Sequence, residues 1–289
     1  MLSSQSLTEM LSALGRGADD ARDLAEHEAH GLFADMLDGR IPALELGALL
    51  TSLRWKHETA DELRGFARAL NERVPALELP PHLPRMVVIP SYARAGQAPN
   101  LMPLLAIMLA RLDVPVLIHG LSGRGAPAGS LDVLERLGHL PCATLHEAQD
   151  TLHAGRCAVL ATEVLNPALD GLIRLRDRMG HRNTAHVVAK LLDPAPLHSL
   201  RVICVADPQL LSRLQDTFLR SPEQALLMRR AQQAQHAGGE AGVARHDDQV
   251  DGDHGGREDQ VLRQQRARRI EELRQHREDE HDRLRVAGI

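Results

Sequence analysis

The stretch from residue 86 to residue 118, MVVIPSYARAGQAPNLMPLLAIMLARLDVPVLI, decides the fold of this chain. Two short runs rich in β-branched residues, Met86-Val87-Val88-Ile89 and Val114-Pro115-Val116-Leu117-Ile118, stand on either side of an apolar helical segment, Asn100–Leu112. Strands that alternate with helices in this way are typical of a mainly parallel sheet covered by helices. The pattern continues with a helix near Ser130–Leu137 and strands at Ala158-Val159-Leu160 and Val202-Ile203-Cys204-Val205. We therefore predict an α/β domain over residues 86–228.

The residues before this domain have a different pattern. Over residues 1–78 apolar side chains recur at helical spacing, which predicts a small helical domain. Thr59 followed by Glu62 has the spacing of a capping box, so we expect a helix from Ala60 to about Arg73. Residues 79–85 contain three prolines, which lack a backbone N–H donor and favour extended conformations in the preceding residues. This segment is predicted to be a linker.

The chain changes character after Met228. Residues 229–289 contain no Phe, Trp or Tyr and are crowded with charged residues, Gln, His and Gly. Such a segment buries too little apolar surface to offset the entropy lost on ordering. We expect a low-complexity, disordered tail in which Gln260–Arg285 is a candidate for a solvated helix. A replaced or frameshifted C-terminus would explain so abrupt a change.

Composition limits the classes of function. With 289 residues, of which 43% are hydrophobic, the chain is long enough for a sizeable core. Its longest apolar stretch, Leu101–Leu112, is interrupted by Pro103 and Arg111 and falls short of the roughly 20 apolar residues of a membrane-spanning helix. The first residues lack the basic and apolar regions of a secretory signal, and the three cysteines are widely spaced. We expect a cytoplasmic protein with reduced thiols and no membrane partner.

Several motifs carry a family resemblance. In the helical part, Gly31-Leu32-Phe33-Ala34-Asp35-Met36-Leu37-Asp38-Gly39 and Glu62-Leu63-Arg64-Gly65-Phe66 resemble the anthranilate phosphoribosyltransferase superfamily (glycosyl transferase family 3). The likeness is closer to the YbiB-type branch, described as non-catalytic, nucleic-acid-binding relatives of the transferase. It is carried over about residues 10–228 by Gly15-Arg16-Gly17, Ile89-Pro90-Ser91-Tyr92, Asn100-Leu101, Met179-Gly180 and Arg182-Asn183-Thr184-Ala185-His186. The resemblance implies a fold of the phosphoribosyltransferase type, a homodimer formed through the helical domain, and DNA, with RNA as an alternative, as the partner.

The positions at which the transferase family handles phosphate differ in this chain. Where the family has a Gly-Thr-Gly-Gly-Asp loop, this chain reads Pro90-Ser91-Tyr92-Ala93-Arg94, and proline has no N–H to donate to a phosphate. The family's Lys-His-Gly-Asn-Arg becomes Ile118-His119-Gly120-Leu121-Ser122, which removes a lysine. A sugar diphosphate needs several donors and a hard cation. We therefore expect no catalysis and no cofactor; the alternative is a phosphoribosyltransferase that uses phosphoribosyl diphosphate and magnesium.

The net charge of −5 means that attraction to nucleic acid requires a local basic patch. Arginine carries nearly all the positive charge, since Lys56 and Lys190 are the only lysines. If Leu172–Met179 is helical, two of its arginines lie on one face at i and i+4. The predicted nucleic-acid-binding residues are Arg174, Arg178, Arg182 and Lys190, which would neutralise backbone phosphates without reading sequence. An ordinary solvated helix face is the alternative interpretation.

Overall fold

The computed structural model describes residues 4–17, 20–92, 100–123, 129–196, 198–221 and 223–229. Residues Met1–Ala234 form one compact unit, to which all the described residues belong. The second unit, Gln235–Ile289, lies outside the described residues, and so does the expected helix Gln260–Arg285.

The N-terminal part is a helical bundle made of α1 (Ser4–Leu14), α2 (Glu26–Leu37), α3 (Ala43–Lys56) and α4 (Ala60–Asn71). The predicted capping box at the start of α4 is confirmed. Thr59 Oγ1 accepts a hydrogen bond from the Glu62 N–H at 3.3 Å, and Glu62 Oε2 accepts one from the Thr59 N–H at 2.8 Å. The same buried carboxylate pairs with Lys56 at 2.9 Å, so the residues that begin α4 also join it to the end of α3.

Helices α2 and α4 pack closely because Gly65 has no side chain. A Cβ at this position would lie 2.3 Å from the carbonyl oxygen of Glu26, well inside van der Waals contact. The rings of Phe33 and Phe66 pack next to this contact, with 5.2 Å between their centroids. Both rings are fully buried and form the centre of the bundle.

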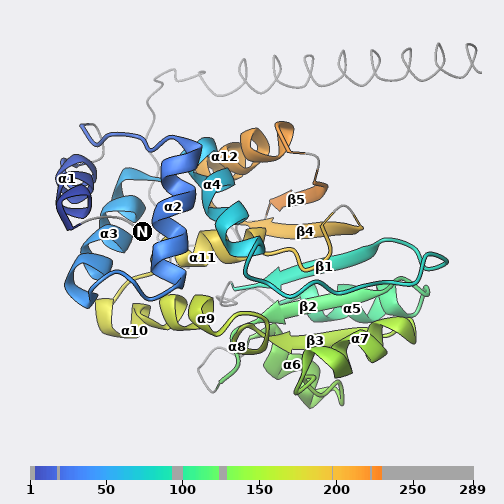
Figure 1. Cartoon of the computed structure of the whole chain (residues 1–289). Coiled ribbons are helices and arrows are strands. Elements are labelled where there is room, and N and C mark those ends of the chain that lie inside the picture. The colour runs from blue at the N-terminus through green and yellow to red at the C-terminus, as the bar shows by residue number, and fades with distance from the viewer. Residues whose placement is uncertain are drawn as a thin grey trace, which may run out of the picture. The chain divides into compact units, whose positions relative to one another are not determined.

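The C-terminal part of the unit is a parallel sheet with the strand order β3-β2-β1-β4-β5. The strands are β1 (Met86–Ser91), β2 (Val116–Gly120), β3 (Cys157–Ala161), β4 (Ser199–Val205) and β5 (Ala225–Arg229). The connecting helices are α5 (Met102–Ala110), α6 (Ser130–Arg136), α7 (Leu145–His153), α8 (Thr162–Leu165), α9 (Pro167–Arg174), α10 (Arg176–Met179), α11 (Ala185–Val188), the 3₁₀ helix η1 (Ala189–Leu191) and α12 (Pro208–Leu219). Figure 1 shows α1 to α4 beside this sheet.

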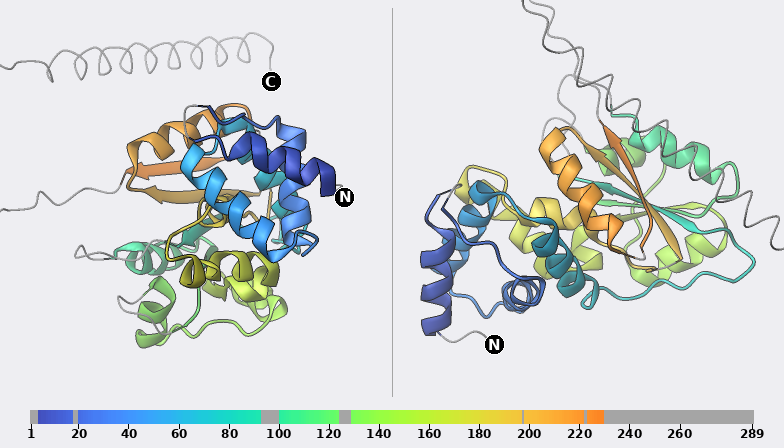
Figure 2. Two further views of the ribbon diagram at one scale, coloured as in Figure 1. Left: turned by 90° about the vertical axis from the view of Figure 1, so that its left-hand side faces the viewer. Right: turned by 90° about the horizontal axis from the view of Figure 1, so that it is seen from above.

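Alternate residues of each strand point to opposite faces of the sheet. On one face, Met86 and Val88 of β1 belong to a buried cluster that also contains side chains of the helical bundle. On the other face, Val87 and Ile89 pack with residues of α5 and α6. Helices α5 and α12 cover opposite faces, as the right-hand view of Figure 2 shows.

Hydrogen bonds join the bundle to the α/β part. Asn71, the last residue of α4, donates through Nδ2 to the Leu191 carbonyl at 3.3 Å and accepts from the Asp193 N–H at 3.0 Å. Asn166 donates to the carbonyl of Arg73 at 3.1 Å. The bundle therefore packs onto the segment that leads into β4.

The observed elements follow the predicted order, with shorter helices. The helix expected at Asn100–Leu112 spans Met102–Ala110, because Pro103 fits the first turn of a helix and Asp113 has a φ of 58° that helical residues do not adopt. Residues 75–85 form neither helix nor strand. In the described part of the chain, no helix is both long and apolar enough to cross a membrane.

Candidate functional site

The carboxyl ends of three neighbouring strands, β1, β2 and β3, lie side by side and form the carboxyl edge of the sheet. Ser91 of β1 lies in register with Gly120 of β2, and Gly120 lies in register with Ala161 of β3. In open α/β sheets, ligands bind outside the carboxyl ends of the strands. Gly120 permits the close approach of the first two strands, since a Cβ there would lie 2.5 Å from the Ser91 carbonyl oxygen.

A buried hydrogen-bonded triplet occupies this edge. The Tyr92 hydroxyl lies 2.9 Å from Nδ1 of His119, and Thr162 Oγ1 donates to the same hydroxyl at 3.0 Å. Because the phenol accepts from Thr162, its own proton is free to be donated to His119. This arrangement places the imidazole proton on Nε2.

Burial sets the charge state of the triplet. It lowers the pKa of His119 to about 3 and raises the pKa of Tyr92, so both side chains are neutral near pH 7. His119 Nε2 is buried and has no hydrogen-bond partner among the described residues. An uncharged, fully packed triplet of this kind does not offer the positive charge that a diphosphate requires.

Polar side chains next to the triplet also bond to one another. Ser91 Oγ donates to Ser130 Oγ at 2.5 Å, and Asn100 Nδ2 donates to the same oxygen at 2.8 Å. The end of β1 is thus tied to the start of α6. Within the described residues, no group of three or more His, Cys, Asp or Glu side chains is placed to hold a metal ion.

Arg174, the last residue of α9, lies beside the ends of the strands but is engaged by neighbours. Its Nε is 2.5 Å from Asp170 Oδ2, and its Nη2 donates to the Ser122 carbonyl at 3.1 Å. The hydrogen bond to Asp170 raises the pKa of Arg174, so the guanidinium stays charged. Its side chain remains 43% exposed, which leaves part of the guanidinium open to a ligand.

Arg178 is exposed on α10. Leu175, between α9 and α10, keeps helical angles of φ −55° and ψ −20°, so Arg174 and Arg178 retain the predicted i, i+4 relation. Among the described residues, no ion pair involves the Arg178 guanidinium. Gly180, with a φ of 76°, ends α10 and turns the chain towards Arg182.

Arg182 is exposed and lies next to the triplet, because its Nη2 donates to the Tyr92 carbonyl at 3.1 Å. The two residues that follow Arg182 form hydrogen bonds with buried groups. Asn183 donates to the Leu172 carbonyl at 2.8 Å, and Thr184 Oγ1 donates to the buried carboxyl of Glu58 at 2.7 Å. Burial raises the pKa of Glu58. The segment that carries Arg182 is therefore anchored to the helical bundle.

The structure places Lys190 in the interior, away from the surface expected for it. Its side chain lies in η1, is 6% exposed as a residue, and donates to the Cys204 carbonyl at 3.1 Å. Burial lowers the pKa of Lys190 to about 8. Lys190 is therefore not available to a nucleic-acid phosphate in this structure. Of the four predicted residues, Arg174, Arg178 and Arg182 lie at the surface.

The sequence motifs contain Tyr92 and His119 separately and do not predict that the two residues form a triplet with Thr162. Tyr92, His119 and Thr162 all lie within one residue of the end of one of three adjacent strands. This common position was the available signal. Their hydrogen bonds depend on the register of the strands, which the sequence alone does not state.

The described unit consists of a helical bundle followed by a parallel α/β part. The sequence matches the glycosyl transferase family in both parts: the helical bundle domain over residues 8–74 and the a/b domain over residues 96–278. The chain belongs to the glycosyl transferase family. The match to the a/b domain continues past Met228, where we expected the family resemblance to end.

The curated relatives of this chain include YbiB and anthranilate phosphoribosyltransferases. The uncharacterized protein YbiB of Escherichia coli K12 is 38% identical over 223 residues, which are 76% of this chain and 69% of that protein. The anthranilate phosphoribosyltransferase of Desulforudis audaxviator is 33% identical over 175 residues, 60% of this chain and 49% of that enzyme. The chain thus spans about half the length of that transferase and about two thirds of YbiB.

Solved structures share the fold. The anthranilate phosphoribosyltransferase of Thermus thermophilus superimposes with a TM-score of 0.62 at 22% identity, over 74% of this chain and 62% of that one. The Saccharomyces cerevisiae enzyme, solved in complex with PRPP and Mg, gives a TM-score of 0.59 at 16% identity, over 78% and 66%. These likenesses support the predicted fold class.

Proposed function

We propose that this protein binds nucleic acid through the arginine patch formed by Arg174, Arg178 and Arg182, and that it does so without catalysis. Guanidinium groups contact phosphate oxygens in bidentate geometry and release counterions from the backbone. The binding is largely independent of sequence, since such contacts do not read base edges. The observation that carries the proposal is the position of these three arginines, on one exposed segment beside the carboxyl edge of the sheet.

The chemistry of the sheet edge supports the absence of catalysis. Tyr92 lies 4% exposed where a diphosphate loop would need glycine backbone, and its hydroxyl is bonded to a neutral histidine. Lys190, the nearby lysine, is held by the Cys204 carbonyl. No charged lysine or glycine-rich backbone described at this edge takes the role that phosphoribosyl diphosphate requires.

Homodimerisation through the helical bundle belongs to the same proposal. Leu44 and Trp55 are 82% and 69% exposed on α3 and are eleven positions apart, which places them three turns apart on one face. Ala48, also exposed, lies between them on that face. A two-fold dimer formed by this face buries the apolar side chains and presents two arginine patches to one strand, which raises avidity.

The direct test is a fluorescence-anisotropy titration of labelled single- and double-stranded oligonucleotides at low and moderate salt. We expect salt-sensitive binding by the wild type, weakened by about tenfold or more in Arg174→Ala/Arg178→Ala/Arg182→Ala. Arg136→Ala, which changes an exposed arginine on α6, is the matched control and should bind like the wild type. A folded wild-type protein that binds no oligonucleotide at low salt would refute the proposal.

The alternative activity is tested with the same preparation. Anthranilate phosphoribosyltransferases are among the relatives of this chain, so the protein is incubated with phosphoribosyl diphosphate, anthranilate and magnesium. We expect no release of diphosphate above the background of a buffer control. Turnover that survives purification and is lost in Arg182→Ala would favour the transferase instead.

A further inference from the structure

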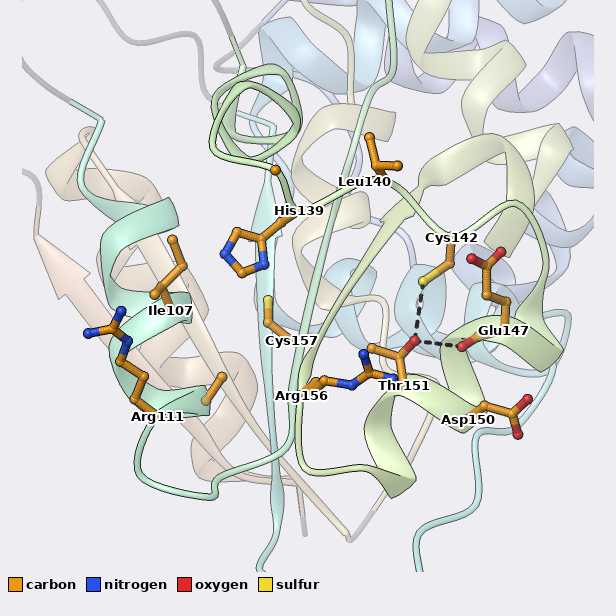
Figure 3. A pocket seen from close by; sticks show the side chains of 12 residues that line it. Ile107, Arg111, His139, Leu140, Cys142, Glu147, Asp150, Thr151, Arg156 and Cys157 are labelled. Atoms are coloured by element: carbon orange, nitrogen blue, oxygen red, sulfur yellow. Dashed lines mark hydrogen bonds between the residues drawn. The ribbon is translucent and has the colours of Figure 1, made fainter.

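A cavity of about 570 Å³ beside Cys157, the first residue of β3, is lined by charged side chains that do not converge. In Figure 3, Arg111 and Arg156 lie on opposite sides of Cys157. The carboxylates of Glu147 and Asp150 point away from the floor of this cavity. A single anion cannot contact both guanidinium groups there. Two arginines that do approach a common point lie elsewhere, where the loop between α3 and α4 meets α12.

Arg54 and Arg213 reach this place from distant parts of the chain. Arg54 lies in the last turn of α3, and Arg213 lies in the second turn of α12. Leu214, the neighbour of Arg213, belongs to the same buried cluster as Leu63 of α4, and the two helices are in contact. The turn of α12 that carries Arg213 therefore packs against the start of α4, which directly follows the α3–α4 loop.

The charges of both arginines act on the loop residues His57 and Glu58. Partial burial, and then the charges of Arg213 and Arg54, lower the pKa of His57. Burial raises the pKa of Glu58, and the same two charges oppose that rise. Because both guanidinium groups influence both residues, the two groups lie close to one another beside the loop.

Neither guanidinium has an ion-pair partner among the described residues, although both arginines are half-buried. Nε and Nη2 of Arg213 are buried and make no hydrogen bond. The acidic groups that act on the loop are engaged elsewhere. Glu58 accepts a hydrogen bond from Thr184 at 2.7 Å, and Asp207 caps α12 by accepting one from the Gln209 N–H at 2.9 Å. Partly desolvated guanidinium groups without a carboxylate are stabilised by an anion that binds between them.

The backbone of His57 also indicates a binding site. His57 ends α3 with a φ of 67°, a left-handed conformation that favours glycine. Residues held in such conformations cluster at sites where a ligand is bound. Here the conformation sets an exposed imidazole beside the two guanidinium groups. A neutral imidazole offers one ring N–H as a hydrogen-bond donor.

From this arrangement we infer that Arg54, His57 and Arg213 bind a phosphate group. Two guanidinium groups supply both the charge and the paired N–H donors that suit phosphate oxygens. A carboxylate carries a single negative charge and balances only one of the two arginines. The inference does not depend on the proposed nucleic-acid binding, since Arg54 and Arg213 are not part of the arginine patch.

The test is thermal unfolding of the full-length protein in inorganic phosphate, with the ionic strength held constant by NaCl. At a phosphate concentration about ten times the Kd, the midpoint should rise by about 3–6 °C above its value in NaCl alone. Arg54→Gln/Arg213→Gln should lose most of this rise, and Arg54→Lys/Arg213→Lys, which keeps both charges, should retain part of it. The surface control Arg136→Gln and the triple alanine variant of the arginine patch should show the full rise.

NMR of the wild-type protein locates the phosphate without any substitution. Added phosphate should shift the imidazole signals of His57 and raise the pKa of His57, because the anion offsets the positive charges that lower it. The inference is overturned if the midpoint rises no more in phosphate than in NaCl, or if the His57 signals do not move. It is also overturned if the glutamine variant keeps the full rise, or if only the arginine-patch variant loses it.

Oligonucleotide titration of Arg54→Gln/Arg213→Gln identifies the source of the phosphate once the site is established. Weaker binding than the wild type would assign the bound phosphate to a nucleic-acid backbone. Unchanged binding would assign it to a free phosphate or a small phosphate ester. A wild-type protein that binds phosphate but no oligonucleotide would refute the proposed function and leave this inference in place.

Discussion

The phenol oxygen of Tyr92 lies 2.9 Å from Nδ1 of His119, although the two residues are 27 positions apart in the chain. They meet because β1 and β2 are parallel neighbours whose last residues, Ser91 and Gly120, lie in register. Thr162 completes the arrangement from the end of β3. The edge at which an α/β sheet usually offers backbone and charge to a ligand is here filled by side chains that bond to one another, while Nε2 of His119 has no partner among the described residues.

Tyr92→Phe tests the contribution of this arrangement to stability. The change removes one hydroxyl and leaves both Thr162 Oγ1 and His119 Nδ1 without their buried partner. We expect the free energy of unfolding to fall by about 1–3 kcal/mol, measured by urea denaturation. Thr151→Val, which removes a hydroxyl bonded to a carbonyl within the partly exposed α7, is the control and should cost less. Equal stability of Tyr92→Phe and wild type would contradict the structure.

His119 predicts a dependence of stability on pH. Its pKa is about 3 in the folded protein against an ordinary value of 6.5, so below about pH 6.5 the unfolded chain takes up a proton that the folded chain does not. The free energy of unfolding therefore decreases as the pH falls from about 6.5 towards 3, by roughly 1.4 kcal/mol per pH unit for this group. The buried imidazole of His186, whose pKa is also about 3, acts in the same direction.

The measurement compares chemical denaturation of wild type and His119→Asn at several pH values between about 6 and 4.5. The free energy of unfolding of the variant should change less steeply with pH, because the contribution of His119 to that slope is lost. This expectation holds whatever the absolute stability of the variant. His146→Gln, at a side chain that is 87% exposed, should keep the wild-type slope. A His119→Asn variant with an unchanged slope would show that the imidazole is not buried in its neutral form.

Substitutions of Lys190 and Arg178 compare the contribution of a buried cation to oligonucleotide binding with that of an exposed one. Lys190→Met preserves the length of a buried side chain whose Nζ, among the described residues, donates to the Cys204 carbonyl, so we expect oligonucleotide affinity within about twofold of the wild type. Arg178→Ala removes an exposed charge and should weaken binding and reduce its dependence on salt. Anisotropy titrations at several salt concentrations measure both quantities. A strong loss of affinity in a folded Lys190→Met protein would reverse this assignment.

Gly65 and Gly47 form a matched pair in the helical bundle. Alanine at Gly65 places a Cβ 2.3 Å from the Glu26 carbonyl oxygen and 2.8 Å from Ala29 Cβ, so α2 and α4 must separate. We expect Gly65→Ala to lower the free energy of unfolding by about 1–3 kcal/mol. Gly47→Ala meets nothing within 4 Å on α3 and should stabilise by up to about 1 kcal/mol. Thermal unfolding followed by circular dichroism measures both, and similar effects of the two changes would contradict the close packing.

Particular residues show how far the sequence predicts the fold. Thr59 and Glu62 predict the start of α4 correctly, because a capping box depends on residues three positions apart. The short β-branched runs likewise predict β1 to β4, whose core faces follow from simple alternation. The end of α5 is less well predicted, since Leu112 continues the apolar pattern while the positive φ of Asp113 ends the helix.

The candidate site is predicted less completely, for reasons that differ from residue to residue. Arg174 and Arg178 keep their helical spacing, which is a local property. The burial of Lys190 was visible in part, because Val187, Val188, Leu191 and Leu192 surround it in the sequence, but its bond to Cys204 requires the position of β4. The bond from Arg182 to the Tyr92 carbonyl spans 90 positions and depends on the complete packing of the unit.

The bundle and the sheet share one buried cluster, so the folding of each part depends on the other. Phe33 of α2 and Val88 of β1 belong to the same cluster, and Asn71 bonds to both Leu191 and Asp193. Neither part can bury its apolar face alone, so cutting the chain between residues 78 and 86 should give two fragments that recover native circular dichroism only when mixed. We therefore expect the bundle and the sheet to melt in a single cooperative transition, so that a destabilising mutation in either part lowers the free energy of unfolding of both.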